Sequence, residues 1–313
     1  MNFDVAVWSE RDPWRIINAA EKIDGRIEGI WLPETVELDS VSILGAVAAR
    51  TNSLKLGAGI LNIYTRTIPL IAMTAATLQL ISRNRFSLGI GVSTNNILEK
   101  HGLRINQPLR QLRIAIQNLR FAYSHDTHKM STGFRLPFSV SYPIYIGTIG
   151  EQISSLAGEL ADGLIFNCAT PAYAKRLASR AILAAEKIGR NRNQLDIKSA
   201  LIFSLDLQRD RQSIIRRLAY YGAAASYNRM FKQSGFLTES EQLSKAWQNK
   251  DPSKAQQAIS DNMIASLTAT PGNIPKLIQD YASTGITGIT LVPVDFTSAA
   301  DYLANSRLQT ESN

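Results

Sequence analysis

The chain has 313 residues, of which 45% are hydrophobic, and it carries a formal net charge of +8 at pH 7. This composition excludes wholesale disorder and is typical of a globular protein with a sizeable core. No apolar run approaches the ~18 residues of a membrane span, and the first residues contain no secretory signal, so we expect a soluble, cytoplasmic protein. The one cysteine, Cys168, excludes an intramolecular disulfide, and its apolar neighbours predict a buried, inert thiol.

Basic residues are spread along the chain, which predicts a solvated basic surface. An acidic ligand, a nucleic acid and an anionic surface are the alternative explanations of the positive charge. We expect a small-molecule substrate, with neither nucleic acid nor membrane as a partner.

Short apolar strands alternate with helices in the first third of the chain. Pro13 favours a helix start, because the N–H that proline lacks is not needed in a first helical turn. Asp39 or Ser40 caps the next helix. The predicted strands are 3–8, 28–32, 55–60 and 86–91, and the predicted helices are 13–23, 41–50 and 68–81.

The alternation continues toward the C-terminus. A polar, irregular stretch at 124–142 predicts a loop over the sheet edge. A long helical section at about 211–265 has breaks near Gly235 and Asp251-Pro252. The remaining predicted helices are 107–123, 151–160, 171–188 and 271–283, and the remaining predicted strands are 143–147, 163–167, 199–205 and 285–293.

Eight short strands separated by helices predict a parallel sheet, and eight such strands can close into a barrel. The alternative, an open doubly wound sheet, usually has a GxGxxG turn after its first strand, where this chain has Trp8-Ser-Glu-Arg-Asp-Pro13. We therefore predict an α/β fold, a (β/α)8 TIM barrel forming a single domain over 1–313. The stretch 211–270 is longer than one crossover helix, and we expect a helical insertion there between strands seven and eight.

Five short motifs carry a resemblance to a known family. They are 56–66 (LGAGILNIYTR), 72–78 (AMTAATL), 84–93 (NRFSLGIGVS), 143–150 (PIYIGTIG) and 156–163 (LAGELADG). In this order they resemble the bacterial luciferase-like monooxygenase superfamily of flavin and deazaflavin oxidoreductases. The closest branch looks like the coenzyme F420-dependent methylenetetrahydromethanopterin reductases, and the resemblance covers about residues 3 to 295.

The resemblance implies a barrel that holds a flavin or deazaflavin across its C-terminal rim. It implies a non-proline cis peptide bond between Gly59 and Ile60, whose bulge supports the ring, and a hydrogen bond from Asn62 to the polar edge of the ring. It also implies that Ser93 and Thr94 contact the ring or its ribityl chain. If no cofactor binds there, Gly59 and Ile60 form an ordinary strand end and Asn62 forms a turn. Ser93 and Thr94 then cap a loop or a helix.

A phosphate site is expected at Gly147, Thr148, Ile149 and Gly150, which match the second signature of the family. They lie between a predicted strand and a helix start, where backbone N–H groups point outward. Glu151 follows immediately, and its carboxylate competes for the same donors unless it turns away.

Two carboxyl groups are candidate catalytic acids. Many family members carry Asp-His after strand two, where this chain has Pro33-Glu34, so Glu34 is the nearest replacement. Glu99 follows strand four where the family often has an acidic residue, and Glu10 is a third candidate. A structural salt bridge is the alternative role for each.

Other chemistries find little support in the sequence. The three histidines, His101, His125 and His128, are not accompanied by clustered cysteines or carboxylates, so we expect no metal site. No GxSxG elbow or Walker sequence is present.

The aromatic and basic residues of 220–231 are expected to pack within the helical insertion, with nucleic-acid stacking as the alternative. Arg216, Arg217, Arg229 and Lys232 could instead meet an acidic cofactor tail or substrate. F420 carries an acidic polyglutamate tail, which would suit the positive net charge of the chain.

We therefore expect an enzyme that transfers a hydride between F420 and a small substrate, such as a methylenetetrahydromethanopterin-like pterin. One alternative is a luciferase-like monooxygenase that uses FMN and oxygen. Another is a catalytically inactive barrel that acts as a binding protein. The resemblance also implies a homodimer.

Overall fold

The computed structural model describes residues 1–123 and 134–306. Strands and helices alternate along both stretches. The strands are β1 (Asn2–Ala6), β2 (Gly29–Leu32), β3 (Lys55–Asn62), β4 (Phe86–Gly91), β5 (Ile144–Gly147), β6 (Gly163–Asn167), β7 (Asp196–Phe203), β8 (Thr268–Ala269) and β9 (Gly288–Pro293). The helices are α1 (Pro13–Ile23), α2 (Ser40–Arg50), α3 (Ile68–Ile81), α4 (Asn95–Leu98), η1 (Glu99–His101), α5 (Pro108–Tyr123), α6 (Glu151–Leu160), α7 (Pro171–Lys187), η2 (Arg192–Gln194), α8 (Leu207–Gly222), α9 (Ala225–Gln233), α10 (Leu237–Gln248), α11 (Pro252–Gln257), α12 (Asp261–Leu267), α13 (Ile274–Ala282) and α14 (Phe296–Asn305).

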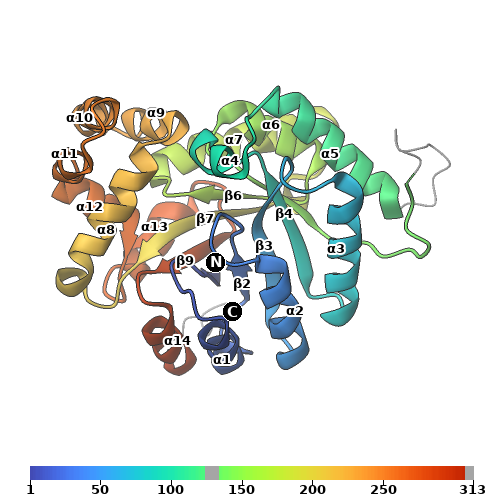
Figure 1. Ribbon diagram of the computed structural model, residues 1–313. Helices are drawn as coiled ribbons and strands as arrows, with labels where there is room; N and C mark the ends of the chain where they lie inside the picture. The colour runs from blue at the N-terminus through green and yellow to red at the C-terminus, as the bar shows by residue number, and fades with distance from the viewer. Residues whose placement is uncertain (124–133, 307–313) are drawn as a thin grey trace.

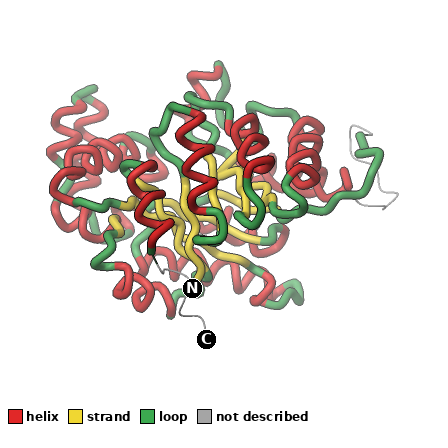
Figure 2. The backbone as a smooth tube through the Cα atoms, turned by 90° about the horizontal axis from the view of Figure 1, so that it is seen from below, coloured by secondary structure: helices red, strands yellow, loops and turns green. Residues whose placement is uncertain are grey.

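Eight of the strands form a closed ring. Strands β1 to β7 pair in chain order, β7 pairs with β9, and β9 pairs with β1, all in parallel. Helices surround this ring, as Figure 1 shows from the side and Figure 2 from below. The predicted (β/α)8 barrel is therefore confirmed, and the open doubly wound sheet is wrong for this chain.

The strands of the ring overlap the eight predicted ones. The sequence did not reveal β8, which has two residues and pairs with β7, because so short a strand leaves no pattern. Between β7 and β9 the chain forms α8 to α12, with more breaks than predicted, and Figure 1 shows them together on the left. The predicted loop at 124–142 lies partly outside the described residues, and 134–142 contains no helix or strand.

Side-chain caps fix the starts of several helices at the carboxyl ends of the strands. The Asp12 carboxylate accepts a hydrogen bond from the N–H of Trp14 at the start of α1. Asp39 does the same for Ser42 in α2, as predicted. Because such caps satisfy N–H groups that have no partner within the helix, they set where each loop enters its helix.

Two aromatic side chains fill the barrel interior because glycines face them. Trp31 on β2 packs against Gly57 on β3, where an added Cβ would lie 2.1 Å from the Trp31 ring. Tyr145 on β5 packs against Gly163 on β6, where an added Cβ would lie 2.3 Å from the Tyr145 ring. The two rings meet edge to face with their centroids 5.1 Å apart. Together they close the barrel below its mouth.

A buried ion pair lies beside these rings. Lys198 Nζ on β7 lies 2.5 Å from Asp4 Oδ2 on β1, which also accepts a hydrogen bond from Trp31 Nε1 at 3.1 Å. Asp196 lies 3.4 Å from the same ammonium and accepts a hydrogen bond from the Tyr145 hydroxyl at 2.7 Å. Burial lowers the pKa of Lys198, but the attraction of Asp4 and Asp196 outweighs it, so the pKa is raised. The pairing ties β1, β2, β5 and β7 together through polar contacts.

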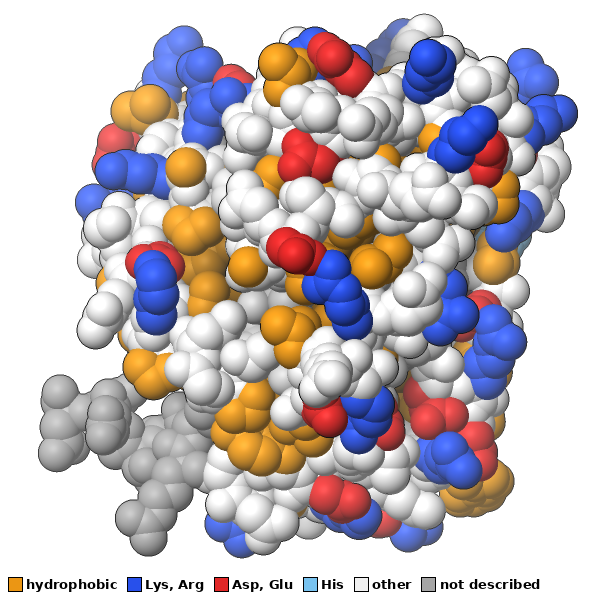
Figure 3. Space-filling view, turned by 90° about the vertical axis from the view of Figure 1, so that its left-hand side faces the viewer, with side chains coloured by type: hydrophobic (Ala, Val, Ile, Leu, Met, Phe, Trp, Pro, Cys, Tyr) orange, Lys and Arg blue, Asp and Glu red, His pale blue; other side chains and the backbone are white. Residues whose placement is uncertain are grey.

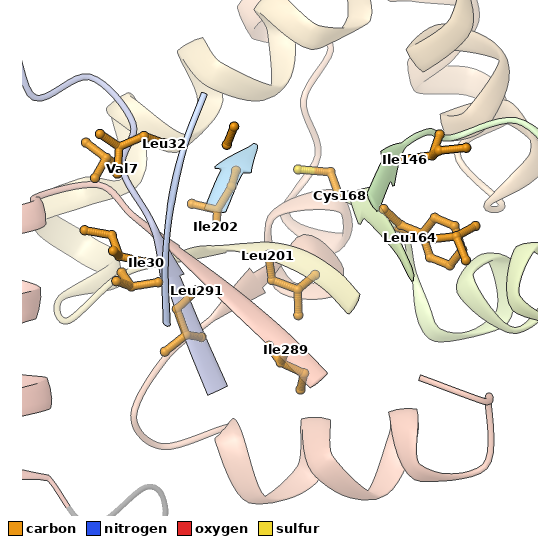
Figure 4. Close-up of a cluster of buried hydrophobic side chains, with 14 of the residues drawn as sticks. Val7, Ile30, Leu32, Ile146, Leu164, Cys168, Leu201, Ile202, Ile289 and Leu291 are labelled. Atoms are coloured by element: carbon orange, nitrogen blue, oxygen red, sulfur yellow. The ribbon is translucent and has the colours of Figure 1, made fainter. Parts of the chain in front are cut away.

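Apolar side chains on the other face of the strands pack beneath the helices. Ile30 and Leu32 on β2 and Leu291 on β9 are at most 2% exposed. Figure 4 shows them in one cluster of buried side chains that also includes Cys168. Cys168 is buried, as predicted, and burial raises the pKa of its thiol to about 12, in keeping with the expectation of an inert side chain.

Basic side chains are dispersed on the face of the molecule that Figure 3 presents. Lysines and arginines lie there singly or beside acidic residues. Arg211 of α8 pairs with Asp261 of α12, for example. Within the described residues, no helix is both long and apolar enough to span a bilayer.

The substitution Gly57→Ala tests the interior packing. We expect a loss of about 1–3 kcal/mol of unfolding free energy, because the added methyl group would overlap the rigid Trp31 ring. Gly45→Ala is the matched control, since Gly45 lies within α2 and nothing approaches its added Cβ. Alanine there should stabilise the protein by up to about 1 kcal/mol through helix propensity. Urea unfolding measures both variants, and equal stabilities would contradict the packing argument.

Candidate active site

A cavity of about 610 Å³ opens where the barrel strands end. Its wall combines the carboxyl ends of strands, the segments that follow them, and residues of α8 and α9. Ligands bind at this edge in parallel α/β folds, and the volume lies within the usual range for small-molecule sites. The predicted site residues in its wall are Glu34, Gly59, Ile60, Ser93, Thr94, Gly147, Thr148, Ile149 and Gly150.

The peptide bond between Gly59 and Ile60 is cis, as the resemblance implies. The register of β3 against β4 shifts between Ala58 and Leu61, so the strand bulges at the cavity. The Ile60 side chain uses space beside Gly147, where an added Cβ would lie 2.6 Å from Ile60 Cγ2. Glycine at the end of β5 therefore allows the bulge to pack into the mouth of the barrel.

Ser93 and Thr94 bring two hydroxyl groups to the cavity after β4. Thr94 occupies the N-cap position of α4, but its side chain forms no capping hydrogen bond. Ser93 has a left-handed φ of 58°, which turns the chain between β4 and α4. A hydroxyl can donate and accept, so both residues suit a polar ligand.

Asn62 lies outside the cavity wall and is 3% exposed. Its Oδ1 accepts a hydrogen bond from the N–H of Tyr64 at 2.8 Å. This is the turn-forming role that the sequence offered as the alternative to ring binding. The Asn62 Nδ2 group is buried and has no hydrogen-bond partner among the described residues.

The N-terminus of α6 forms one end of the cavity. Thr148 Oγ1 accepts a hydrogen bond from the N–H of Gly150, which shapes the turn before the helix. The carboxylate of Glu151 turns away from this turn to Arg176 at 2.9 Å and to Arg180 at 2.8 Å. The competition between Glu151 and an anion is therefore removed. The N–H groups of the first turn, which lack helical partners, remain for a ligand.

The predicted acids lie in different places. Both oxygens of Glu34 accept hydrogen bonds from Arg66, at 2.9 and 2.7 Å, and Arg66 also reaches Asp39. Glu99 lies in η1, is exposed, and is not part of the cavity wall. Glu10 lines an adjoining cavity and accepts two backbone N–H groups. The fold thus brings Glu34 to the site and leaves Glu99 outside it.

An aromatic wall stands in the same cavity, and sequence reasoning did not assign it to the site. Trp8 meets Tyr221 edge to face at 5.4 Å, and Tyr221 stacks on Tyr227 at 4.8 Å. Asn167 Nδ2 donates a hydrogen bond to the Tyr227 hydroxyl at 2.7 Å. Burial raises the pKa of both tyrosines, so their hydroxyls stay protonated. Trp8 and Asn167 are the last residues of the first and sixth predicted strands. Their position at the carboxyl end of a strand was the signal that could have assigned them to the site.

One hydroxyl in the wall has no hydrogen bond. Thr290 on β9 lines the cavity, and its Oγ1 is buried without a partner among the described residues. An unsatisfied buried polar group costs about 1–3 kcal/mol, so a ligand that hydrogen-bonds Thr290 would recover that cost. Among residues 1–123 and 134–306, no group of three or more His, Cys, Asp or Glu is placed to hold a metal ion. His125 and His128 lie outside the described residues.

A parallel (β/α)8 barrel with a cavity at the carboxyl ends of its strands defines a class of enzymes that bind ligands with their βα loops. Within this class, the chain belongs to the luciferase-like monooxygenase family, whose sequence profile matches residues 15–288. The resemblance stated from the five motifs is thereby confirmed, and the chain is an oxidoreductase of this family.

Three proteins illustrate what the chain is similar to. The 5,10-methylenetetrahydromethanopterin reductase of Archaeoglobus fulgidus is 26% identical over 283 residues, which cover 85% of each chain. The structure of the coenzyme F420-dependent tetrahydromethanopterin reductase from Methanopyrus kandleri superposes with a TM-score of 0.78 at 19% identity, covering 97% of each chain. The structure of an F420-dependent secondary alcohol dehydrogenase with an F420–acetone adduct gives 0.76 at 16% identity, again over 97% of each chain. The two structures share the fold.

The Glu34–Arg66 pair should stabilise the rim of the barrel. Glu34→Gln and Arg66→Met should each lower the unfolding free energy by about 1–3 kcal/mol. Arg66→Met leaves the largely buried Glu34 carboxylate without its ion-pair partner, and Glu34→Gln leaves Arg66 with Asp39 alone. The double variant should lose less than the sum of the two single losses. Strictly additive losses in urea unfolding would show that the two side chains do not interact directly.

Proposed function

We propose that this oxidoreductase transfers a hydride between coenzyme F420 and a small organic substrate, with a methylenetetrahydromethanopterin-like pterin as the first candidate. The observation that carries the proposal is one cavity that joins the Gly59–Ile60 bulge to the N-terminus of α6. Such a cavity offers a platform for a flat ring and a separate anion site. The similarity to the Archaeoglobus reductase over 85% of both chains supports the choice of the pterin, and two proteins of similar structure are named as F420-dependent.

The wall residues fit the parts of this cofactor. Gly59 and Ile60 would support one face of the ring, and Ser93 and Thr94 would hydrogen-bond the ring or its ribityl chain. The segment 147–150 with the first turn of α6 would hold the phosphate. An added Cβ at Gly150 would meet nothing closer than 4.0 Å, so the turn has room for a bound anion.

Arg229 suits the acidic tail of F420. It lies in the cavity wall, is exposed, and forms no ion pair among the described residues. The neighbouring Arg176 already binds Glu151 and lies over the Tyr173 ring, so it is less free to change partners. Arg229 therefore offers a free positive charge on the same side as the proposed phosphate site.

When bound, F420 would supply or accept the hydride. Trp8, Tyr221 and Tyr227 would exclude water from the opposite side of the cavity and orient the substrate. Of the two predicted acids, we propose Glu34, because it lines the cavity and Glu99 does not. To act as the acid, Glu34 would carry a proton on one oxygen and donate it to the substrate, while its other oxygen keeps a hydrogen bond from Arg66.

The family name supports a second candidate, an FMN-dependent monooxygenase. Titrating the purified protein with F420 and with FMN, followed by fluorescence, separates the candidates. We expect F420 to bind at micromolar concentration, about tenfold or more tightly than FMN. Tighter binding of FMN would favour the monooxygenase, and binding of neither would leave a barrel without redox chemistry.

The substitution Gly150→Val tests the proposed phosphate site. Its backbone has extended φ and ψ that valine adopts readily, so the fold should be retained while the side chain fills the anion site. We expect F420 affinity to fall about tenfold or more. Gly272→Val is the control, because Gly272 also has open space around its added Cβ but lies outside the cavity. Equal affinities for the two variants would place the phosphate elsewhere.

We also propose that the chain forms a homodimer through α3. This helix contains no charged residue, yet Leu70, Met73, Leu80 and Ile81 are each more than 40% exposed. Their spacing places them along one stripe, and a stripe of this kind on a surface helix is typical of a protein interface. A second copy presenting the same helix would cover it symmetrically.

Met73→Glu should shift this dimer to monomer, because the interface would have to bury an unpaired carboxylate. Light scattering after size exclusion measures the mass. Leu183→Glu is the control, since Leu183 is 60% exposed on α7 and away from α3. A wild-type monomer, or a dimer that survives Met73→Glu, would rule out this interface.

A further inference from the structure

A second cavity, of about 440 Å³, adjoins the candidate active site. Its wall is formed by the segments after β1 and β2 and by residues of α1, α2, α4, η1 and α8. The two cavities share part of their walls. The residues that line both are Val7, Trp8, Pro33, Thr35, Ile97 and Tyr220.

The inner part of the second cavity is apolar. Ile16, Leu32 and Ile43 line it and are each at most 6% exposed. Leu38 and Val294 also line it and pack against the same core. This surface suits a hydrocarbon or aromatic segment of a ligand, and it offers such a segment little hydrogen bonding.

A buried cation stands in this wall. Arg217 of α8 is 7% exposed, and its guanidinium lies 5.4 Å from the Trp8 ring centre. Two of its N–H groups donate to the carbonyl oxygens of Val292 and Pro293, at 3.1 and 3.2 Å. Among the described residues it forms no ion pair, and burial lowers its pKa. Because a buried charge without a counter-ion is costly, the site favours an anion.

The other charged groups around the cavity leave this positive charge uncompensated. Arg216 and Lys100 line the wall, are exposed, and form no ion pair in the described part of the chain. The two carboxylates in the wall are already engaged. Glu37 binds Arg11 at 2.8 Å, and Glu10 lies 4.0 Å from Arg15 and accepts two backbone N–H groups. The remaining attraction is therefore for a negative ligand.

We propose that the second cavity binds the anionic end of an elongated substrate. That end is a carboxylate or phosphate, joined through an apolar spacer to the group that reacts in the first cavity. Arg217 binds the anion, and Arg216 and Lys100 attract it at the mouth. The identity of the reacting end rests on the proposed function, whereas binding of the anionic end does not.

A pair of probes that differ only in charge tests this site. 4-Phenylbutyrate and 4-phenyl-1-butanol both carry an apolar body of suitable length, and calorimetric titration measures their affinities. We expect the carboxylate to bind about tenfold more tightly to the wild type. Arg217→Met should remove this preference while the alcohol still binds, which shows that the cavity is intact. Equal affinities of the two probes for the wild type would overturn the proposal.

Two further variants test the site without replacing the buried Arg217, so their results do not depend on whether Arg217→Met folds correctly. The double variant Lys100→Ala/Arg216→Ala changes only exposed side chains, and it should reduce the preference about threefold at low salt. Arg211→Ala removes the same charge from α8 outside both cavities and should leave the preference unchanged. An unchanged preference in the double variant, or an equal loss in Arg211→Ala, would contradict a role for these cations.

The F420 titration separates this proposal from the proposed function. Arg217 does not line the first cavity, so its methionine variant should bind F420 with wild-type affinity. If the wild type fails to bind F420 but prefers 4-phenylbutyrate, the cofactor assignment fails and the anion site stands. If the wild type binds F420 but binds both probes equally, the cofactor assignment stands and the anion site fails.

Discussion

Close packing of large side chains against glycines is the constraint on which the site depends. Trp31 lies in the barrel interior and Ile60 at its mouth, and an added Cβ at the facing positions on neighbouring strands would overlap both side chains. Gly57 makes this room for Trp31, and Gly147 makes it for Ile60. Because interiors are packed at crystal-like density, these contacts hold the bulge of β3 in one position. The floor of the cavity therefore belongs to the core of the barrel and does not depend on a mobile loop.

Electrostatics at the rim follow a consistent pattern. The acidic side chains near the cavities have partners within the chain: Glu34 binds Arg66, and Glu151 binds Arg176 and Arg180. Several cations lack such partners among the described residues, and Arg229 lines the first cavity while Lys100, Arg216 and Arg217 line the second. The chain has a net charge of +8, and its unpaired cations at the cavities offer two positions for anions. We have proposed that one binds the cofactor tail and that the other binds the distal end of a substrate.

The site was predicted best where residues are close in the sequence. The segment 147–150 and the pair Ser93 and Thr94 reach the cavity because each directly follows a strand, and a parallel barrel brings all such segments to one edge. Asn62 is the last residue of β3, but its side chain caps the turn that follows and is buried outside the cavity wall. Glu99 lies one short helix further along, and that helix carries it outside the cavity.

The sequence by itself determined the alternation of strands and helices, the closed barrel and the family, because these depend on local periodicity and on short motifs. It also located the residues that follow each strand. Only the tertiary structure decided which of them meet. The helices that contribute Tyr221, Tyr227 and Arg217 are far from Trp8 in the sequence. No local sequence pattern predicts that α8 and α9 lie over the end of β1. Contacts between distant segments are set by the packing of whole elements, so both cavities became visible only in three dimensions.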